Sequence, residues 1–351
     1  MKPLSRPLPV AFSRVTDPAS LPARERPNLL AKYRVTTGAV AISRADHPVP
    51  ASGSTGCRRT LADCRDCPRP PNCDRSLHHA VPRNGPQLDA AYNNSAAVPE
   101  RDAIVADWAA RSARVRREYS GRLDLAYGET PRERLDLFLA ADPKAPTLAF
   151  IHGGYWQMSD KESFAFFAEG LLTLGINLAV IEYTLAPAAR LDRIVAEVRR
   201  AGRWLAEHLA DYGADPSRLY VSGHSAGGHL TAMSIPLPEV RGAIAISGIY
   251  DLEPIRLTYL NEKLGLDTAE AERNSPVRHL PATAGELVVA YGTRELPELC
   301  RQSIEYARTW TERGLSGRLL PVDGADHFTI LDALARPEGA LTRALLAMLG
   351  R

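Results

Sequence analysis

Long apolar runs are missing from this sequence of 351 residues. No stretch approaches the roughly 18 consecutive apolar residues that a membrane-spanning helix needs, which argues against a transmembrane protein. The N-terminus also lacks the apolar core, roughly 7–15 residues long, of a secretory signal. We therefore expect no export by that route and a cytoplasmic location. With 45% apolar and 24% charged residues, the composition is typical of a globular protein with a sizeable core.

Acidic residues are scarce in the first quarter of the chain. Residues 1–86 contain 13 of the 27 prolines, 14 Lys and Arg and only 6 Asp and Glu, a net charge of +8, whereas the remainder carries −6. Hydrophobic periodicity is weak over residues 1–86, and such segments rarely bury enough apolar surface to offset the entropy of ordering. We interpret residues 1–86 as a basic, proline-rich leader, expected to be disordered, and residues 87–351 as one globular domain.

Cysteine is almost confined to this leader, and Cys300 is the single exception. Cys57, Cys64, Cys67 and Cys73 include one C-x-x-C pair, a spacing that can bind zinc. The interval from Cys67 to Cys73 is too short for the second half of a zinc finger, and prolines interrupt it. An unstructured tract is therefore the preferred interpretation, and we expect no metal site.

Methionine is scarce as well: the three methionines after Met1 all fall within residues 87–351. A second interpretation of the leader is that it is not native protein. A shorter natural product would then begin at a codon now read as Val81, Leu88 or Val98. Mass spectrometry of the natively expressed N-terminus distinguishes the two interpretations.

Regular alternation of strands and helices follows the leader. The short apolar strands, separated by helices, indicate βαβ units and a mostly parallel, doubly wound α/β sheet with helices on both faces. A hairpin with its turn at 128–131 adds antiparallel strands at one edge. The expected strands are 123–127, 134–139, 147–151, 177–183, 218–222, 242–247, 286–291 and 317–321, and the expected helices are 101–118, 161–174, 191–212, 226–235, 297–313 and 339–349.

The strongest chemical motif is G-x-S-x-G at residues 223–227, centred on Ser225. It follows an expected strand and precedes an apolar helix, the context in which this motif forms a nucleophile elbow. The flanking glycines permit a sharp turn that presents the serine hydroxyl at the carboxyl edge of the sheet. Ser225 is therefore the predicted nucleophile.

A serine that attacks a carbonyl needs hydrogen-bond donors for the oxyanion that forms. One is expected on the residue after the nucleophile, Ala226. The loop after strand 147–151 supplies the others, the backbone amides of Gly153, Gly154 and Tyr155, because adjacent glycines let the backbone approach a substrate closely.

The general base is expected to follow the nucleophile and the acid along the chain. Among the nine histidines, His327 lies in a loop after the last strand, where the base of such a fold is expected. Glu295, in the loop after strand 286–291, is the predicted acid that orients it. Glu298, Asp323 and Asp326 remain competitors for that role.

These motifs resemble the α/β-hydrolase family that includes the arylformamidases (kynurenine formamidases) and related esterases. The resemblance runs from about residue 88 to the C-terminus and excludes the leader. The motifs at 152–157 and 223–230 are shared broadly among hydrolases, whereas the stretches at 247–255 and 297–303 are more specific to this family. The matching segments are 92–94 (YNN), 152–157 (HGGYWQ), 223–230 (GHSAGGHL), 247–255 (SGIYDLEPI), 273–276 (RNSP) and 297–303 (PELCRQS).

The resemblance implies an α/β-hydrolase fold and hydrolysis of an aryl formamide, with N-formylkynurenine as the reference substrate, or of small aryl esters. Carried over by position, Ser225 is the nucleophile, Glu295 the acid and His327 the base. The family more often has Asp at the acid position. Broader hydrolases carry a third glycine where this chain has Tyr155, and the pair Tyr155 and Trp156 is expected to wall the acyl pocket and favour a small acyl group.

The expected partner is a small-molecule substrate, with no cofactor, no nucleic acid and no membrane, and assembly into a homodimer is left open. The alternative activity is that of a general short-acyl carboxylesterase. A catalytically silent hydrolase fold is disfavoured because all three triad residues are present. Nucleic-acid binding through the leader is disfavoured because the domain is acidic.

Overall fold

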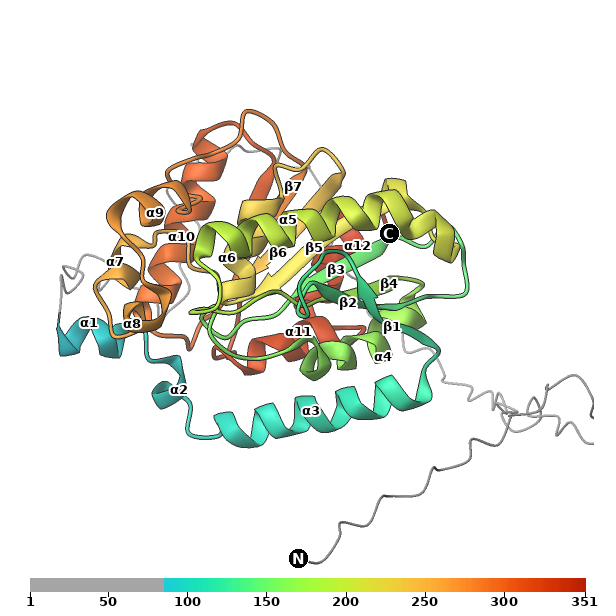
Figure 1. Ribbon diagram of the computed structural model, residues 1–351, viewed down its shortest axis with the longest axis horizontal. Coiled ribbons are helices and arrows are strands. Elements are labelled where there is room, and N and C mark those ends of the chain that lie inside the picture. The colour runs from blue at the N-terminus through green and yellow to red at the C-terminus, as the bar shows by residue number, and fades with distance from the viewer. Residues whose placement is uncertain (1–84) are drawn as a thin grey trace, which may run out of the picture. The chain divides into compact units, whose positions relative to one another are not determined.

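An eight-stranded sheet organises residues 85–351, the part of the chain that the computed structural model describes (Figure 1). The strand order is β1-β2-β4-β3-β5-β6-β7-β8. β2 pairs antiparallel with β1 and β4, and the remaining strands run parallel. The predicted mostly parallel sheet with an antiparallel hairpin at one edge is confirmed. The strands are β1 (Gly121–Ala126), β2 (Arg134–Phe138), β3 (Thr147–Ile151), β4 (Asn177–Ile181), β5 (Leu219–His224), β6 (Val240–Ile246), β7 (Glu286–Gly292) and β8 (Gly317–Val322).

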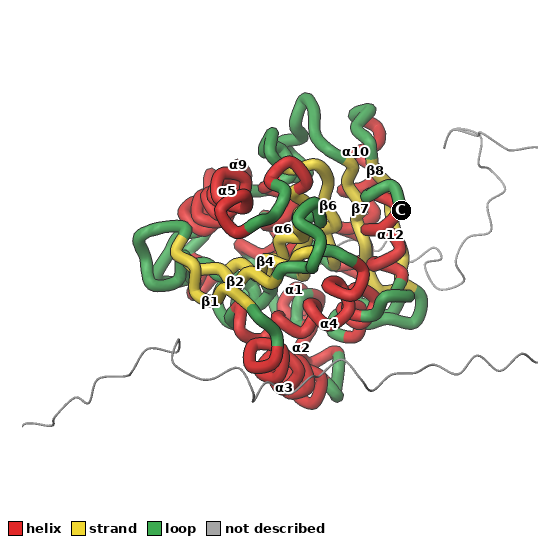
Figure 2. Tube along the Cα trace, turned by 90° about the vertical axis from the view of Figure 1, so that its right-hand side faces the viewer, coloured by secondary structure: helices red, strands yellow, loops and turns green. Residues whose placement is uncertain are grey.

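Helices cover both faces of this sheet (Figures 1 and 2). The α-helices are α1 (Pro86–Ala91), α2 (Asn94–Ala97), α3 (Arg101–Glu118), α4 (Ala168–Leu171), α5 (Leu191–His208), α6 (Ala226–Ser234), α7 (Glu253–Arg256), α8 (Asn261–Leu264), α9 (Thr268–Arg273), α10 (Pro297–Glu312), α11 (Asp332–Ala335) and α12 (Ala340–Met348). Short 3₁₀ helices are η4 (Lys161–Phe167), η5 (Leu172–Leu174), η6 (Leu209–Tyr212), η7 (Pro216–Arg218) and η8 (Thr329–Leu331).

Side chains of the central strands alternate between two apolar clusters, one on each face. In β3, Ala149 and Ile151 belong to the cluster that also contains residues of α5, α6 and α10. Leu148 and Phe150 belong to the other, with residues of α3, α4, α11 and α12. Because successive side chains of a strand point to opposite faces, a strand buried on both sides reads as a continuous apolar run, which is why residues 147–151 were recognisable.

The helix predicted over 161–174 is present, and most of that segment is 3₁₀ helix. Asp160 caps it by accepting from the Ser163 amide at 3.0 Å. A 3₁₀ turn brings residues i and i+3 into line, and Phe164 and Phe167 both contact Phe150, with ring centroids 5.5 and 4.5 Å away. Both rings thereby pack this segment against β3.

Two short helices that the sequence did not predict, α1 and α2, precede α3. Leu88 and Tyr92 in this segment are fully buried. The Tyr92 hydroxyl donates to Glu298 at 2.9 Å, and the Tyr259 amide donates to Asp89 at 2.9 Å. The segment 86–98 is thus packed against the rest of the described domain.

The disorder predicted for the leader and the question of metal binding by its cysteines concern residues outside those described. The domain boundary near residue 86 stays a prediction. Among residues 85–351, no helix combines the length and apolar character that crossing a membrane requires.

Candidate active site

A strained turn between β5 and α6 carries Ser225. Its φ of 58° and ψ of −117° lie in a region that non-glycine residues rarely adopt. A Cβ at Gly227 would lie 2.0 Å from the Ile151 carbonyl oxygen, and one at Gly223 would lie 2.3 Å from that of Gly227. Both flanking positions therefore require glycine. The Ser225 amide is held by the Ile246 carbonyl at 2.8 Å, which anchors the turn to β6.

A buried carboxylate–imidazole pair lies in the same part of the fold. Glu295 Oε2 is 2.9 Å from His327 Nδ1, and both residues are less than a tenth exposed. The other carboxylate oxygen, Oε1, accepts from the Ser247 hydroxyl at 2.5 Å and from the Gly292 amide at 2.6 Å. Glu295 is thus fixed from three directions, and a carboxylate so held can orient an imidazole and stabilise its protonated form.

The competing acids make different contacts. Glu298 lies at the start of α10 and accepts from Tyr92 and Arg301. Asp326 accepts from the amides of Phe328 and Thr329 on its own loop. Asp323 accepts from Thr293 at 3.3 Å. Among the described residues, Glu295 is the one acid of the four that pairs with His327.

His224, whose only sequence signal is its place in the G-x-S-x-G motif, contacts His327 directly. Its Nε2 donates to the His327 carbonyl at 2.7 Å, and the two rings lie 4.6 Å apart. Burial and the neighbouring His327 hold the pKa of His224 well below its usual range, so its ring is neutral. His224 therefore links the elbow to the loop of His327 without adding charge.

The loop after β3 follows a fully buried histidine. His152 Nε2 is 2.9 Å from Glu182 Oε1, and the Tyr183 hydroxyl donates to the His152 carbonyl at 3.0 Å. Gly154 and Tyr155 have φ values of 104° and 51°. A Cβ at Gly153 would lie 2.8 Å from the His224 carbonyl oxygen, so this glycine lets the loop approach the elbow.

Free backbone donors distinguish this loop and the start of α6. Within residues 85–351 the amides of Gly153, Gly154, Tyr155 and Ala226 donate no hydrogen bond to backbone or side chain. Unpaired amides of this kind can stabilise an oxyanion.

A cavity of about 500 Å³ joins these elements. Ser225, His224 and His327 line it, as do Gly153, Gly154 and Tyr155. Aromatic rings of α3, η4 and the His327 loop form an apolar part of the wall. The other lining residues are Asn93, Asn94, Ser95, Arg101, Val105, Trp108, Gln157, Met158, Ser159, Ser163, Phe164, Tyr259, Leu260, Glu262, Lys263 and Phe328.

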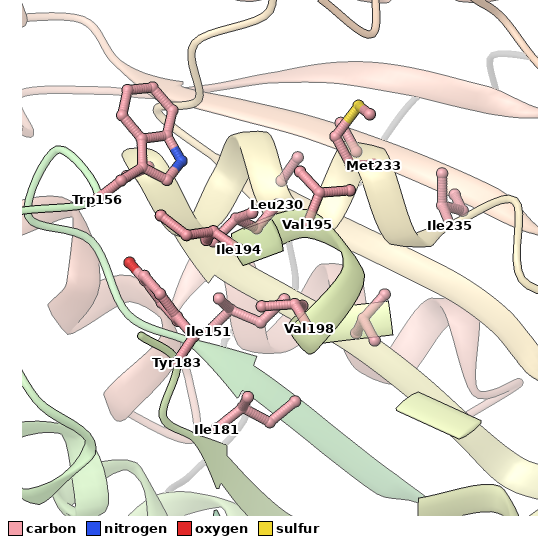
Figure 3. Close-up of a cluster of buried hydrophobic side chains, with 14 of the residues drawn as sticks. Ile151, Trp156, Ile181, Tyr183, Ile194, Val195, Val198, Leu230, Met233 and Ile235 are labelled. Carbon is pink, nitrogen blue, oxygen red and sulfur yellow. The ribbon is translucent and has the colours of Figure 1, made fainter. Parts of the chain in front are cut away.

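The structure corrects the expectation that Trp156 walls the acyl pocket. Trp156 is completely buried and does not line the cavity; it packs in the apolar cluster with Ile194 and Tyr183 (Figure 3). Its indole Nε1 donates to His229 Nδ1 at 3.3 Å, while His229 Nε2 donates to the Asn274 carbonyl at 2.8 Å. The physical reason is that the indole finds an apolar surrounding and an acceptor for its N–H in the core.

Tyr155, the other half of the aromatic pair, does line the cavity. Its hydroxyl donates to the Tyr92 carbonyl and accepts from Asn94 Nδ2 at 2.9 Å. Burial raises the pKa of Tyr155 far above its usual range, so it stays protonated. The segment 86–98 thereby contacts the loop after β3.

The amino-acid sequence is similar to those of known hydrolases. The BD-FAE family model matches residues 135–240. Kynurenine formamidase of Danio rerio is 36% identical over 244 residues, which cover 65% of this chain and 82% of that protein. The chain belongs to the kynurenine formamidase and esterase family of α/β-hydrolases.

Other members and neighbours agree with this placement of the chain among α/β-hydrolases. Kynurenine formamidase of Drosophila melanogaster is 28% identical, over 63% of this chain and 79% of that protein. A crystal structure of a protein provisionally described as a thioesterase, from Silicibacter sp. TM1040, has a TM-score of 0.67 at 31% identity. The match covers 75% of this chain and 100% of the Silicibacter protein chain. The protein is accordingly a hydrolase of amide or ester bonds, as members of this family are.

Proposed function

We propose that this hydrolase cleaves N-formyl groups from aryl amines through a triad of Ser225, His327 and Glu295. The observation that carries the proposal is the 2.9 Å contact between Glu295 and His327 beside the cavity that Ser225 lines. The preferred substrate is N-formylkynurenine, because two relatives, 36% and 35% identical, are named kynurenine formamidases.

In the proposed first half-reaction, Ser225 attacks the formyl carbonyl while His327 takes the hydroxyl proton. Glu295 holds the imidazole by its Nδ1 side and stabilises the imidazolium that forms. The oxyanion accepts hydrogen bonds from Ala226 and from amides of the 153–155 loop. The tetrahedral intermediate collapses when His327 returns the proton to the aryl amine, which leaves.

In the second half-reaction, His327 takes a proton from water, which attacks the formyl-enzyme. Formate leaves, and Ser225 regains its proton. Every proton is carried by His327, so the neutral His224 beside it has a positioning role only.

The experiment that tests the substrate compares kcat/KM of the wild-type protein for N-formylkynurenine and for p-nitrophenyl acetate. Our proposal predicts a higher value for the formamide. Turnover of the ester alone would instead identify a short-acyl carboxylesterase, which is the second candidate function. Relatives such as LipM of Mycobacterium tuberculosis favour this candidate; LipM is named as a probable carboxylic ester hydrolase and is 28% identical to this chain.

A cytoplasmic location and a homodimer stay proposals. Fractionation of the native source tests the first, and light scattering coupled to gel filtration tests the second.

A further inference from the structure

Charged side chains are few in the wall of the active-site cavity. Apart from histidines, they are Arg101, Glu262 and Lys263. Arg101 begins α3, and the other two lie on α8. The hydrogen bond between Tyr259 and Asp89 joins the segment before α8 to the segment before α3. Two separate elements therefore bring a net positive charge to one cavity.

The two cations are not committed to strong ion pairs. Arg101 contacts Asp102, the next residue, whose side chain is 87% exposed, and exposed pairs of this kind contribute little. The Arg101 Nε atom is buried and has no hydrogen-bond partner among the described residues. Lys263 makes no ion pair within the described part of the chain. A guanidinium with a free buried N–H is suited to a carboxylate ligand.

A matching acceptor lies in the same wall. Asn94 is 3% exposed, and its Nδ2 donates to the Tyr155 hydroxyl. Its Oδ1 is buried and has no partner among residues 85–351. Arg101 and Asn94 both line the cavity. Because buried polar atoms are normally paired, their unpartnered Nε and Oδ1 atoms point to a ligand that supplies both an anion and an N–H group.

We propose that these residues form a subsite for an α-amino-acid group on the substrate. Arg101 and Lys263 bind its carboxylate, and Asn94 Oδ1 accepts from its ammonium group, which Glu262 also favours by charge. Trp108, Phe164 and Phe328, which line the same cavity, contact the aryl ring. This inference rests on the proposed function, since it names the part of an aryl formamide that is remote from the scissile bond.

The subsite makes the enzyme selective for zwitterionic aryl formamides over neutral aryl esters. The charged group is remote from the scissile bond, and its binding energy raises kcat/KM for the substrate that carries it. The measured quantity is the ratio of kcat/KM for N-formylkynurenine to kcat/KM for p-nitrophenyl acetate. We expect Arg101→Met to lower this ratio about tenfold or more, and Arg101→Lys to lower it less, because an ammonium keeps the charge but loses the fork of donors.

Arg117→Met is the matched control, because Arg117 lies on the same helix, is 68% exposed and does not line the cavity. Its ratio should equal that of wild type. A ratio that stays within about twofold of wild type in Arg101→Met and in the double variant with Lys263→Met overturns the proposal. Thermal melting of each variant checks that the fold is retained.

A second measurement separates failure of the subsite from failure of the proposed substrate. Inhibition of p-nitrophenyl acetate hydrolysis is compared for kynurenine and its methyl ester, which lacks the carboxylate. Wild type should be inhibited more strongly by kynurenine, and Arg101→Met should lose this difference. Equal inhibition of wild type by both compounds overturns the subsite, even where N-formylkynurenine is not turned over.

Discussion

The Ser247 hydroxyl donates to Glu295 Oε1 across 2.5 Å, on the carboxylate whose other oxygen contacts His327. Ser247 directly follows β6 and has a φ of 51°, a conformation that costs free energy for a residue with a side chain. Its amide donates to the Ala290 carbonyl at 2.7 Å. The end of β6 thus helps to position the acid that follows β7.

Removal of this hydroxyl should weaken catalysis without abolishing it. In Ser247→Ala, Glu295 Oε1 retains only the Gly292 amide, so the carboxylate holds His327 less firmly. We expect kcat to fall about tenfold with KM little changed. Ser234→Ala is the control, because that buried hydroxyl donates to the Leu230 carbonyl within α6 and touches no triad residue. An equal loss of kcat in both variants would contradict the positioning role.

Substitution of Glu295 tests separately the contributions of its side-chain length and of its charge to catalysis. Glu295→Asp withdraws the carboxylate by one methylene, so it cannot contact Ser247, Gly292 and His327 together, and we expect kcat to fall about 10–100-fold. Glu295→Gln keeps the length but removes the charge that stabilises the imidazolium, and kcat should fall about 10³–10⁴-fold. Steady-state kinetics on one ester substrate measures both. An aspartate variant slower than the glutamine variant would show that geometry outweighs charge here.

Most of the fold and much of the candidate site could be predicted because they depend on local signals. The apolar run 147–151 and the G-x-S-x-G motif each identify themselves within a few residues. Glu295 and His327 are predictable from their place after successive strands, since the carboxyl ends of parallel strands meet at one edge. The structure brings these two side chains within hydrogen-bonding distance.

The remainder depends on where side chains point and on contacts that are distant in sequence. Trp156 follows Tyr155 directly, yet one side chain enters the core and the other the cavity, and residue order carries no signal for this choice. Ser247 is 48 residues from Glu295, and Tyr92 is 206 residues from Glu298. Phe164 and Phe167 of η4 contact Phe150 of β3, which is on another element.

Truncation of the chain tests whether the segment that precedes α3 is needed for activity. A chain that begins at Val98 lacks Tyr92 and Asn94, both of which contact the Tyr155 hydroxyl. We expect it to lose most of its activity, because the 153–155 loop loses this support, whereas a chain that begins at Gly85 should retain activity close to that of the full chain. Esterase turnover and thermal melting measure the effect. Full activity from Val98 would contradict the role given to this segment.

Stability should fall with acidity because His229 is buried in its neutral form. Burial lowers the pKa of His229 to about 4, below its ordinary value of 6.5. Between these values the unfolded chain binds the proton and the folded chain does not, so the free energy of unfolding decreases as pH falls from 6.5 toward 4. The contribution of this one residue across the window is about 3 kcal/mol.

Urea unfolding at a series of pH values measures this dependence. Replacement His229→Gln should reduce the slope of stability against pH within the window, although it lowers stability at neutral pH. Trp156→Phe is the control, because it removes the hydrogen bond to His229 and keeps the titrating group. An unchanged slope in His229→Gln would show that His229 does not contribute to this dependence.

We propose that Ser225 is the nucleophile for both the formamide and the ester reaction. The most direct measurement is kcat of Ser225→Ala on N-formylkynurenine and p-nitrophenyl acetate, with thermal melting as the check on folding. We expect kcat to fall about 10⁶-fold for each substrate that the wild type turns over, with the melting temperature retained. Turnover near the wild-type value on either substrate would contradict it.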